Sequence, residues 1–323
     1  MAVVDLLPRW LYNRLRSGWR TALAPIRGRI RAEERDLAAQ VPFGFANAVD
    51  APVPRVAVVC HLFHADLAGA CRAAIDNLPV PATLFLSTDS AAKVPAIARA
   101  FAGWPAERIE IRVLPNRGRD IAPKLVGFAD VYADHDLILF LHTKKSLTAA
   151  IGDRWRSLLF ASLCGSPTIV ASILQVFRQH PDIGIVLPRH LPAIRGLLHW
   201  DGNFSTARSL ARRMGFGIRR HHALDFPAGS MFWARPAALR PLLDLGLTLD
   251  DFPLEEDQVR GTVQHAIERL FLLAAEHAGY RWLKVAAPLP GDDDRTVRPI
   301  PDRTALDRFI LDSRFPLLPQ DRW

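Results

Sequence analysis

The sequence predicts an α/β fold in which a Rossmann-like, mostly parallel sheet is flanked by helices. Short β-branched or apolar runs alternate with segments of helical spacing from Val53 onward, and this alternation is typical of βαβ units. Polar, cationic side chains directly follow the apolar run at residues 136–141. Half of the 323 residues are hydrophobic, which is enough apolar material for one large domain or for one domain with a smaller appendage.

The first half contains four predicted strands with a helix in each interval. Strands joined in this way form a largely parallel sheet, so their carboxyl ends meet at one edge, where ligands bind. The predicted strands cover residues 55–60, 82–87, 109–114 and 136–141, and the helices run from after His64 to about Asn77, from 91 to 102 and from about 121 to 132.

The second half is less regular. A helix is expected to end at His180, because Pro181 follows it, and Gly279 is expected to close the last long helix. The predicted helices cover residues 166–180, 236–245 and 258–277, the strands cover 183–187 and 230–234, and loops around short helices fill 196–220. From about residue 288 the chain is rich in Pro and Asp, which indicates a tail over the surface.

Charge and cysteine content narrow the class of protein. The formal net charge is +8 and the pI is near 10.0, so the surface favours anionic partners. Cys60, Cys71 and Cys164 are far apart, without metal-ligand spacing, which fits a reducing, cytosolic setting. No window approaches the ~20 uninterrupted apolar residues of a membrane-spanning helix, and an acid stands where a signal peptide would be basic. Charge alone suggests nucleic-acid binding, and no recognised motif supports it.

The first 40 residues differ from the rest. Aromatic and apolar residues near helical spacing interleave with arginines there, which predicts a basic amphipathic helix. Such a helix can lie in the headgroup layer of an anionic membrane, or it can pack on the domain with its arginines solvated. The apolar positions are Trp10, Leu11, Leu15 and Trp19, and the basic positions are Arg9, Arg14, Arg16 and Arg20.

Polar residues follow each of the first four predicted strands. Because the carboxyl ends of parallel strands meet at the same edge of a sheet, these side chains are expected to converge on one crevice. The four groups are residues 61–64 with His61 and Phe63, residues 87–89 with Thr88 and Asp89, residues 116–120, and residues 142–145 with His142, Lys144 and Lys145.

The group from Asn116 to Asp120 is the most informative. Gly118 permits a turn closed to other residues, and Asp120 is a candidate N-cap for the helix that follows. A helix N-terminus beside Arg117 and Arg119 suits an anion. Two alternatives remain open: the arginines face water while Asp120 caps the helix, or Asp120 contacts a ribose or sugar hydroxyl.

Four ordered runs resemble the rhamnan synthesis protein F family. They are residues 116–123, 139–146, 226–233 and 262–269, within a resemblance that covers about residues 55–285. The family implies a role in making rhamnose-containing cell-surface polysaccharide as a glycosyltransferase. The order of the runs also looks like a distant GT-A glycosyltransferase, in which a Rossmann-like half binds a nucleotide sugar and a second half binds the acceptor. We therefore expect an N-terminal segment at 1–50, a nucleotide-sugar half at 51–150, an acceptor and catalytic half at 151–287, and a tail at 288–323.

The resemblance also indicates how the site departs from a GT-A enzyme. An Asp-x-Asp would normally hold a divalent cation at the strand end where this chain has His142, Thr143 and Lys144. Fixed cations can stabilise the negative charge that develops on a leaving diphosphate, as a metal does. We therefore expect no metal, with Mg or Mn as the alternative.

Catalysis is expected to need a base as well as these cations. An inverting transfer removes the proton of the acceptor hydroxyl, and Glu255 occupies the acidic position of the family run. The family usually has Asp where this chain has Arg260. Alternatively, the acids at 255–257 only compensate a helix dipole.

Each remaining candidate has a plain structural alternative, such as a core tryptophan or a solvated charge. The expected catalytic residues are Glu255, Lys144 and His142; the nucleotide-sugar residues are His61, Phe63, Thr88, Asp89, Asn116, Arg117, Arg119, Asp120 and Lys145; the acceptor residues are Trp200, Asn203, Gly229, Ser230, His265 and Arg269.

These observations predict a hexosyltransferase. It would move rhamnose or a related sugar from a nucleotide-diphosphate sugar onto a cell-surface polysaccharide or its lipid-linked precursor, with inversion. The expected place is the cytoplasm, or the cytoplasmic face of the inner membrane by peripheral contact with anionic lipid. The alternative function is a catalytically silent GT-A-like protein that binds glycan or organises a polysaccharide-synthesis complex.

Overall fold

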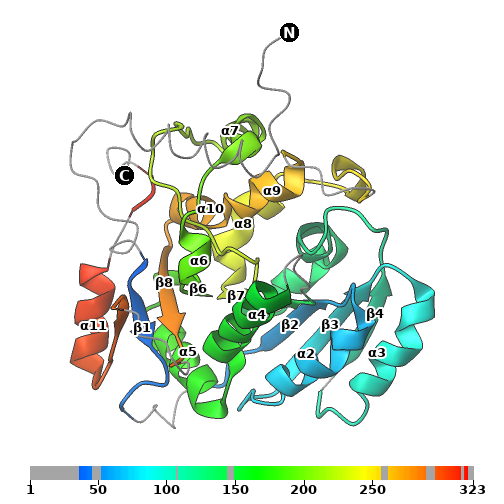
Figure 1. The fold of residues 1–323 in the computed structure, drawn as a ribbon, viewed down its shortest axis with the longest axis horizontal. Coiled ribbons are helices and arrows are strands. Elements are labelled where there is room, and N and C mark those ends of the chain that lie inside the picture. The colour runs from blue at the N-terminus through cyan, green and yellow to red at the C-terminus, as the bar shows by residue number, and fades with distance from the viewer. Residues whose placement is uncertain are drawn as a thin grey trace.

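The computed structural model describes residues 36–45, 52–106, 108–143, 149–255, 261–288, 295–313 and 316–318. These residues form a mixed, mostly parallel sheet with helices on both faces (Figure 1). The predicted Rossmann-like α/β class is therefore confirmed. The basic N-terminal segment, Lys144 and Lys145 lie outside the described residues, and the predicted boundaries between the halves stay a prediction.

The sheet has the order β4-β3-β2-β5-β7-β6-β8-β1-β9 within the described part of the chain. Only β7 runs antiparallel there, paired with β5 on one side and β6 on the other. The carboxyl ends of the other strands therefore lie at one edge. The strands are β1 Ala38–Gln40, β2 Val56–His61, β3 Ala82–Thr88, β4 Ile109–Val113, β5 Leu137–His142, β6 Ile183–Pro188, β7 Phe232–Ala234, β8 Arg281–Ala286 and β9 Val297–Arg298.

Helices cover the two faces of the sheet (Figure 1). The α-helices are α2 Ala68–Ile75, α3 Val94–Ala100, α4 Ala149–Cys164, α5 Pro167–Gln179, α6 Pro192–Arg195, α7 Phe204–Arg213, α8 Arg240–Leu243, α9 Val263–Glu268, α10 Phe271–His277 and α11 Arg303–Asp312. Shorter turns are the 3₁₀ segments η3 Ala65–Leu67, η4 Ala91–Lys93, η6 Ala129–Ala133, η7 Asp201–Asn203, η8 Pro236–Leu239 and η9 Leu249–Asp251, and the π turn η5 Pro123–Gly127.

Two predicted helices are wrong in kind. Residues 121–132 widen into the π turn, in which Phe128 N–H donates to Pro123 O at 3.0 Å, and then tighten into a 3₁₀ turn. The predicted helix at 258–277 is two helices in its described part. It breaks between α9 and α10, where the Arg269 guanidinium donates to the His265 carbonyl at 2.8 Å.

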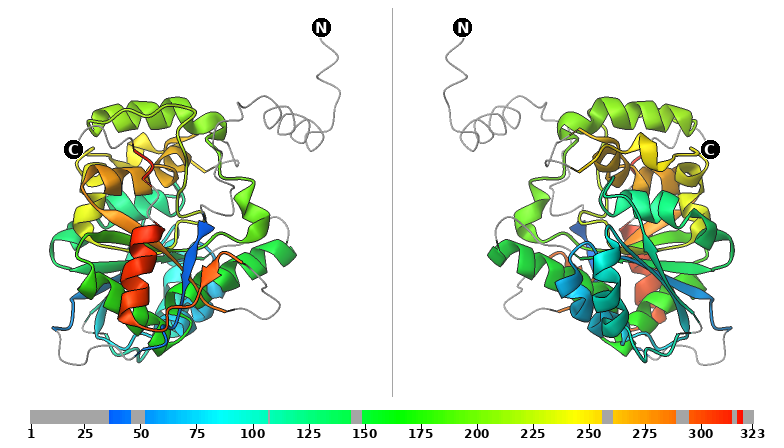
Figure 2. Two further views of the ribbon diagram at one scale, coloured as in Figure 1. Left: turned by 90° about the vertical axis from the view of Figure 1, so that its left-hand side faces the viewer. Right: turned by 90° about the vertical axis from the view of Figure 1, so that its right-hand side faces the viewer.

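Structure also appears where a surface tail was expected. The segment after residue 288 contains β9 and α11, and α11 packs beside β1 at the edge of the sheet (Figures 1 and 2). The apolar residues Leu306 and Ile310 are buried against that edge with Ala39, and burial of such side chains favours an ordered helix.

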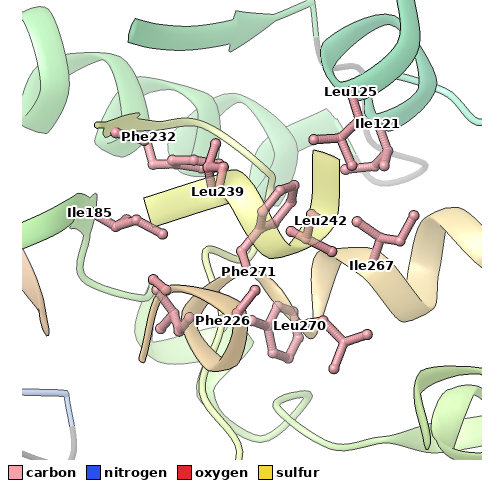
Figure 3. Packing of buried hydrophobic residues seen from close by; sticks show 14 of the residues in the cluster. Ile121, Leu125, Ile185, Phe226, Phe232, Leu239, Leu242, Ile267, Leu270 and Phe271 are labelled. Carbon is pink, nitrogen blue, oxygen red and sulfur yellow. The ribbon is translucent and has the colours of Figure 1, made fainter. Parts of the chain in front are cut away.

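The central strands separate two hydrophobic cores. In β2, Ala57 and Val59 face one core while Val56 and Val58 face the other, as the two-residue period of a strand requires. Figure 3 shows the first core, where side chains from η5, α8, α9 and α10 converge. Packing in these cores fixes the position of each strand along its own axis. It therefore also fixes the position of the polar residues at the strand ends.

Among the described residues, no single helix has the length and apolarity to cross a membrane. The helices Gly152–Cys164 and Pro167–Gln179 meet that test of length and composition only as a pair, with a bend of 63° between them.

Candidate functional site

Two histidines stand side by side at the carboxyl edge of the sheet. The parallel register of β2 and β5 places His61 opposite His142. His61 Nδ1 lies 3.0 Å from Ser87 Oγ on the neighbouring strand β3. Three of the predicted polar strand ends therefore do meet at one edge, as the sequence indicates.

His61 is kept uncharged at neutral pH. It is 8% exposed, and burial lowers its pKa to about 4, against smaller opposing effects of Asp120 and Asp89. A neutral imidazole at this place can accept or donate one hydrogen bond without adding charge.

The turn at 117–120 has a strained backbone. Gly118 and Arg119 have φ angles of 63° and 54°. A Cβ at position 118 would lie 2.4 Å from the Phe252 ring and 2.7 Å from Ala122 Cβ, so only glycine fits. The Asp120 carboxylate does not cap the helix as predicted; it contacts Lys124 Nζ at 3.2 Å.

Lys124 is a buried cation that sequence reasoning missed. It is 2% exposed, and its ammonium donates to the Ser230 carbonyl at 2.7 Å as well as to Asp120. The rings of Phe140, Phe232 and Phe271 lie 5.0–5.3 Å from Nζ. The spacing of four residues between Asp120 and Lys124 is an ion-pair signal on a helix and could have revealed it.

Burial and neighbouring charges shift the pKa values of both Asp120 and Lys124. Burial raises the pKa of Asp120, but His142, Lys124 and His61 outweigh it and bring that pKa to about 2. Burial also dominates at Lys124 and lowers its pKa despite Asp120. At neutral pH the Asp120 carboxylate is therefore ionised, and it lies beside an ammonium whose charged form is disfavoured by burial.

The predicted acceptor residues Gly229 and Ser230 form a second strained turn. Their φ angles are 91° and 53°. His142 Nε2 lies 2.7 Å from the Gly229 carbonyl, which can only accept, so Nε2 carries the proton. Glu268 accepts from Gly229 N–H at 3.2 Å. This turn joins β5 to α9 through His142 and Glu268.

The candidate base Glu255 is held by two donors. Arg119 Nε donates to Oε2 at 3.2 Å, and Gln264 Nε2 donates to Oε1 at 2.6 Å. The Glu255 backbone N–H donates to Asn116 O at 3.2 Å. Arg117 binds the same loop by donating to the Phe252 carbonyl at 2.8 Å. The loop that carries Glu255 is thus attached to the turn at 116–119.

Lys93 contacts both Asp89 and Phe63. The sequence reasoning did not identify this lysine either. Lys93 Nζ donates to Asp89 Oδ1 at 2.5 Å and to the Phe63 carbonyl at 2.7 Å, and it lies 4.3 Å from the Phe63 ring centroid. The buried Thr88 hydroxyl donates to Leu62 O at 3.1 Å. These contacts fix the loops after β2 and β3.

The other acceptor candidates line the packing between 199–206 and 261–269. Arg269 is buried and donates to His199 O at 3.0 Å, and His265 Nδ1 lies 2.6 Å from Thr262 Oγ1. Trp200 is buried and packs edge-on against Phe204 at 5.5 Å, in place of an open stacking face. Asn203 is buried beside it.

The carboxylate Asp120 at the described strand ends is paired with a lysine. Within the residues described here, no three His, Cys, Asp or Glu side chains gather as metal ligands. The Asp120 carboxylate at this edge has the Lys124 ammonium 3.2 Å away, and a nearby positive charge opposes cation binding.

A second buried charge cluster lies across the sheet at β6 and β8. Lys284 Nζ contacts Asp36 Oδ1 at 2.8 Å and Asp225 Oδ2 at 2.6 Å. His190 Nε2 lies 2.8 Å from Asp225 Oδ1, and Arg195 Nε lies 2.6 Å from Asp36 Oδ2. We call these five residues the Lys284 cluster.

The comparison with known proteins decides the family. A family model described as Rhamnan synthesis protein F matches residues 39–280. The chain belongs to this family. The resemblance seen in the sequence is thereby confirmed.

Two relatives of this family member come from two strains of Xanthomonas campestris pv. campestris, and each carries the description uncharacterized protein WxcX. Each is 36% identical over 231 residues, which are 71% of this chain and 32% of the relative. The chain therefore spans about a third of the length of these curated relatives.

Proposed function

We propose that this rhamnan synthesis protein F family member is an inverting glycosyltransferase with a GT-A-like arrangement. It transfers rhamnose or a related hexose from a nucleoside-diphosphate sugar to a polysaccharide, such as an O-antigen, or to its lipid-linked precursor. The observation that carries the proposal is the loop contact of Glu255 with Arg119 at 3.2 Å, which brings the candidate base to the polar edge formed by β2 and β5.

In this proposal the donor binds at the carboxyl edge. His61, His142 and Asp120 orient it there, and Arg119 faces the diphosphate, since its side chain is 38% exposed. Lys144 and Lys145 directly follow Thr143 in the sequence. In this proposal their positive charges stabilise the negative charge that develops on the leaving diphosphate. No metal takes part.

Glu255 removes the proton of the attacking hydroxyl. Its carboxylate is oriented by Arg119 and Gln264, and each oxygen keeps a lone pair for one more hydrogen bond. Because these two donors hold the Glu255 side chain in one conformation, little conformational freedom is lost when it meets the acceptor. The sugar transfer takes place at the cytoplasmic face of the inner membrane, where the basic N-terminal segment binds anionic lipid.

The test is consumption of nucleoside-diphosphate sugars by the full chain, followed by mass spectrometry with and without chelator. Sugar transfer or hydrolysis in the presence of chelator is expected. The variant Glu255→Gln should lower turnover by about 10²–10⁴-fold, the range for loss of a general base. Asp244→Asn is the control, because Asp244 is 55% exposed and its ion-pair partner Arg240 lies outside the site; it should keep wild-type turnover. Activity that requires Mg or Mn would contradict the metal-free reaction.

A silent scaffold is the second candidate. The paired state of Glu255, with Arg119 on one oxygen and Gln264 on the other, favours it, because a carboxylate held by donors is a weaker base. A protein that binds glycan and consumes none of the nucleoside-diphosphate sugars would establish this function in place of transfer.

A further inference from the structure

Strand β4 forms one edge of the sheet. It is the last strand in the sheet order, and within the described part of the chain it pairs only with β3. Figure 1 shows β4 at the end of the row that it forms with β2 and β3. The outer side of an edge strand presents backbone N–H and C=O groups to which another strand can bind.

Alternate residues of β4 direct their backbone groups away from β3. Leu84 N–H donates to the Arg108 carbonyl at 2.9 Å, and Leu114 N–H donates to the Thr88 carbonyl at 2.8 Å. The N–H and C=O of one residue in a parallel strand point to the same side, and successive residues alternate. The even-numbered residues therefore face β3, and the odd-numbered residues of 109–113 face the free edge.

The residues that face the free edge are apolar. Ile109 is 39% exposed and Val113 is 47% exposed, and Ile111 between them is partly buried. No hydrogen bond from any described residue reaches the N–H or C=O groups that these three residues direct outward. The edge therefore combines unpaired backbone groups with exposed apolar side chains, which together favour pairing with another strand.

The charged side chains of β4 lie on its other face and balance one another. Glu110 forms ion pairs with both Arg108 and Arg112, and Arg112 also contacts Asp130 at 2.7 Å. These four side chains carry no net charge, although the whole chain carries +8. Two copies can therefore bring these edges together with less repulsion than other basic surfaces would cause.

The sequence of β4 is complementary to itself in one antiparallel register. When Ile111 of one copy lies opposite Ile111 of the other, Glu110 lies opposite Arg112. In the same register Ile109 lies opposite Val113. A shift by two residues in one direction places Glu110 opposite Glu110, and a shift in the other direction places Arg112 opposite Arg112. Opposite charges across two strands stabilise the pair and like charges destabilise it, so the charges select the first register.

We propose that β4 is a homodimer interface, in which two copies of the chain pair their β4 strands antiparallel across a two-fold axis at Ile111. The outward N–H and C=O groups of each copy bind those of the other, and Ile109 packs against Val113 of the second copy. Pro115, at the next outward position, has no N–H and ends the ladder. Each copy uses the same surface, so the assembly closes at two chains.

The dimer should be reversible, because the interface is small. Two strands of five residues bury little surface, and complexes with small interfaces bind weakly. We therefore expect a dissociation constant in the micromolar range. Sedimentation velocity of the full chain, in a concentration series that spans this range, measures it.

Two charged variants test the register. Ile109→Lys and Val113→Asp each place a charge against an apolar side chain of the second copy, and each should raise the dissociation constant at least about tenfold. In an equimolar mixture the new lysine lies opposite the new aspartate, so the mixture should sediment as a dimer again. Leu311→Lys is the control, since Leu311 is an apolar residue on α11 that is 66% exposed; it should dimerise as the wild type does.

Three outcomes overturn the interface: a wild type that stays monomeric throughout the micromolar range, a dimer that persists unchanged in both single variants, or a mixture that does not dimerise. The second outcome would assign the dimer to another surface. Melting temperatures check that the variants are folded. If either variant melts early, Ile109→Asp and Val113→Lys repeat the test with the charges exchanged.

Discussion

Lys124 and Lys284 are both buried lysines on the sheet, yet their surroundings differ in kind. Lys284 lies between two carboxylates, Asp36 at 2.8 Å and Asp225 at 2.6 Å. Lys124 has one carboxylate, Asp120 at 3.2 Å, and otherwise a backbone carbonyl and aromatic rings. Lys284 therefore contacts two carboxylates, whereas Lys124 contacts one.

The pKa values of the two lysines respond in opposite directions. Burial lowers the pKa of Lys284, but Asp225 and Asp36 outweigh burial and raise it. At Lys124 burial outweighs Asp120, and the pKa falls. Removing one partner of a buried charge pair leaves the other charge uncompensated. The loss should therefore be larger at Lys284, which contacts two carboxylates, than at Lys124, which contacts one.

The largest expected effect is on stability at Lys284. Lys284→Met leaves two buried carboxylates without their shared cation, which should cost about 3–5 kcal/mol of unfolding free energy. Urea unfolding at pH 7 measures it. Arg240→Met is the control, because it breaks an exposed ion pair with Asp244 and should cost under about 1 kcal/mol. Equal losses in the two variants would remove the distinction.

The next effect is a pH dependence that arises mainly from His61, near Lys124. His61 titrates near pH 4 in the fold against 6.5 without burial, so the unfolded chain gains its proton first. Stability should fall by about 3 kcal/mol as the pH drops from about 6.5 to about 4, at ~1.4 kcal/mol per pKa unit.

Urea unfolding of the wild type and of His61→Gln between pH 7 and 4 checks this fall. The variant should lose most of the slope, with a remainder from His222, whose pKa is also lowered. The pKa of Asp225 in the Lys284 cluster is about 2, so that carboxylate gives up its stabilisation only below about pH 4. An unchanged slope in His61→Gln would refute the assignment.

The smallest expected effect is on stability at Lys124. Lys124→Met should cost about 2 kcal/mol, the scale of one charged hydrogen bond, because Asp120 keeps 11% exposure and the neighbouring His142. The pKa of Asp120 should rise from about 2 toward its ordinary value, which ¹³C NMR of the carboxyl group measures. A stability loss as large as that of Lys284→Met would make the two lysines alike.

The strands with strong local signals were predictable, and those with weak signals were not. β2, β3 and β5 are runs of six or seven residues that are almost wholly buried, and the predictions for them lie within a residue or so of their ends. β1 and β9 have three and two residues, too few for a pattern. β8 was missed because Arg281 and Lys284 interrupt its apolar residues.

The candidate site was predictable only where residues are near in sequence or at strand ends. His61 and His142 follow from strand order, and Gly118 follows from its chemistry. Lys124 binds Ser230, 106 positions later, and Arg119 binds Glu255, 136 positions later. Such pairs depend on tertiary packing, which no local pattern in one sequence reports.

The number of residues between Asp225 and Ser230 is fixed by contacts at both ends of this segment. Asp225 is fixed in the Lys284 cluster, and five positions later the carbonyl of Ser230 binds Lys124. Phe226 between them is buried in the core. One residue added to or removed from this stretch could satisfy one lysine only by displacing its contact with the other. Insertions here should therefore be far less tolerated than in the exposed turn at 219–221, although neither stretch contains a strand or a long helix.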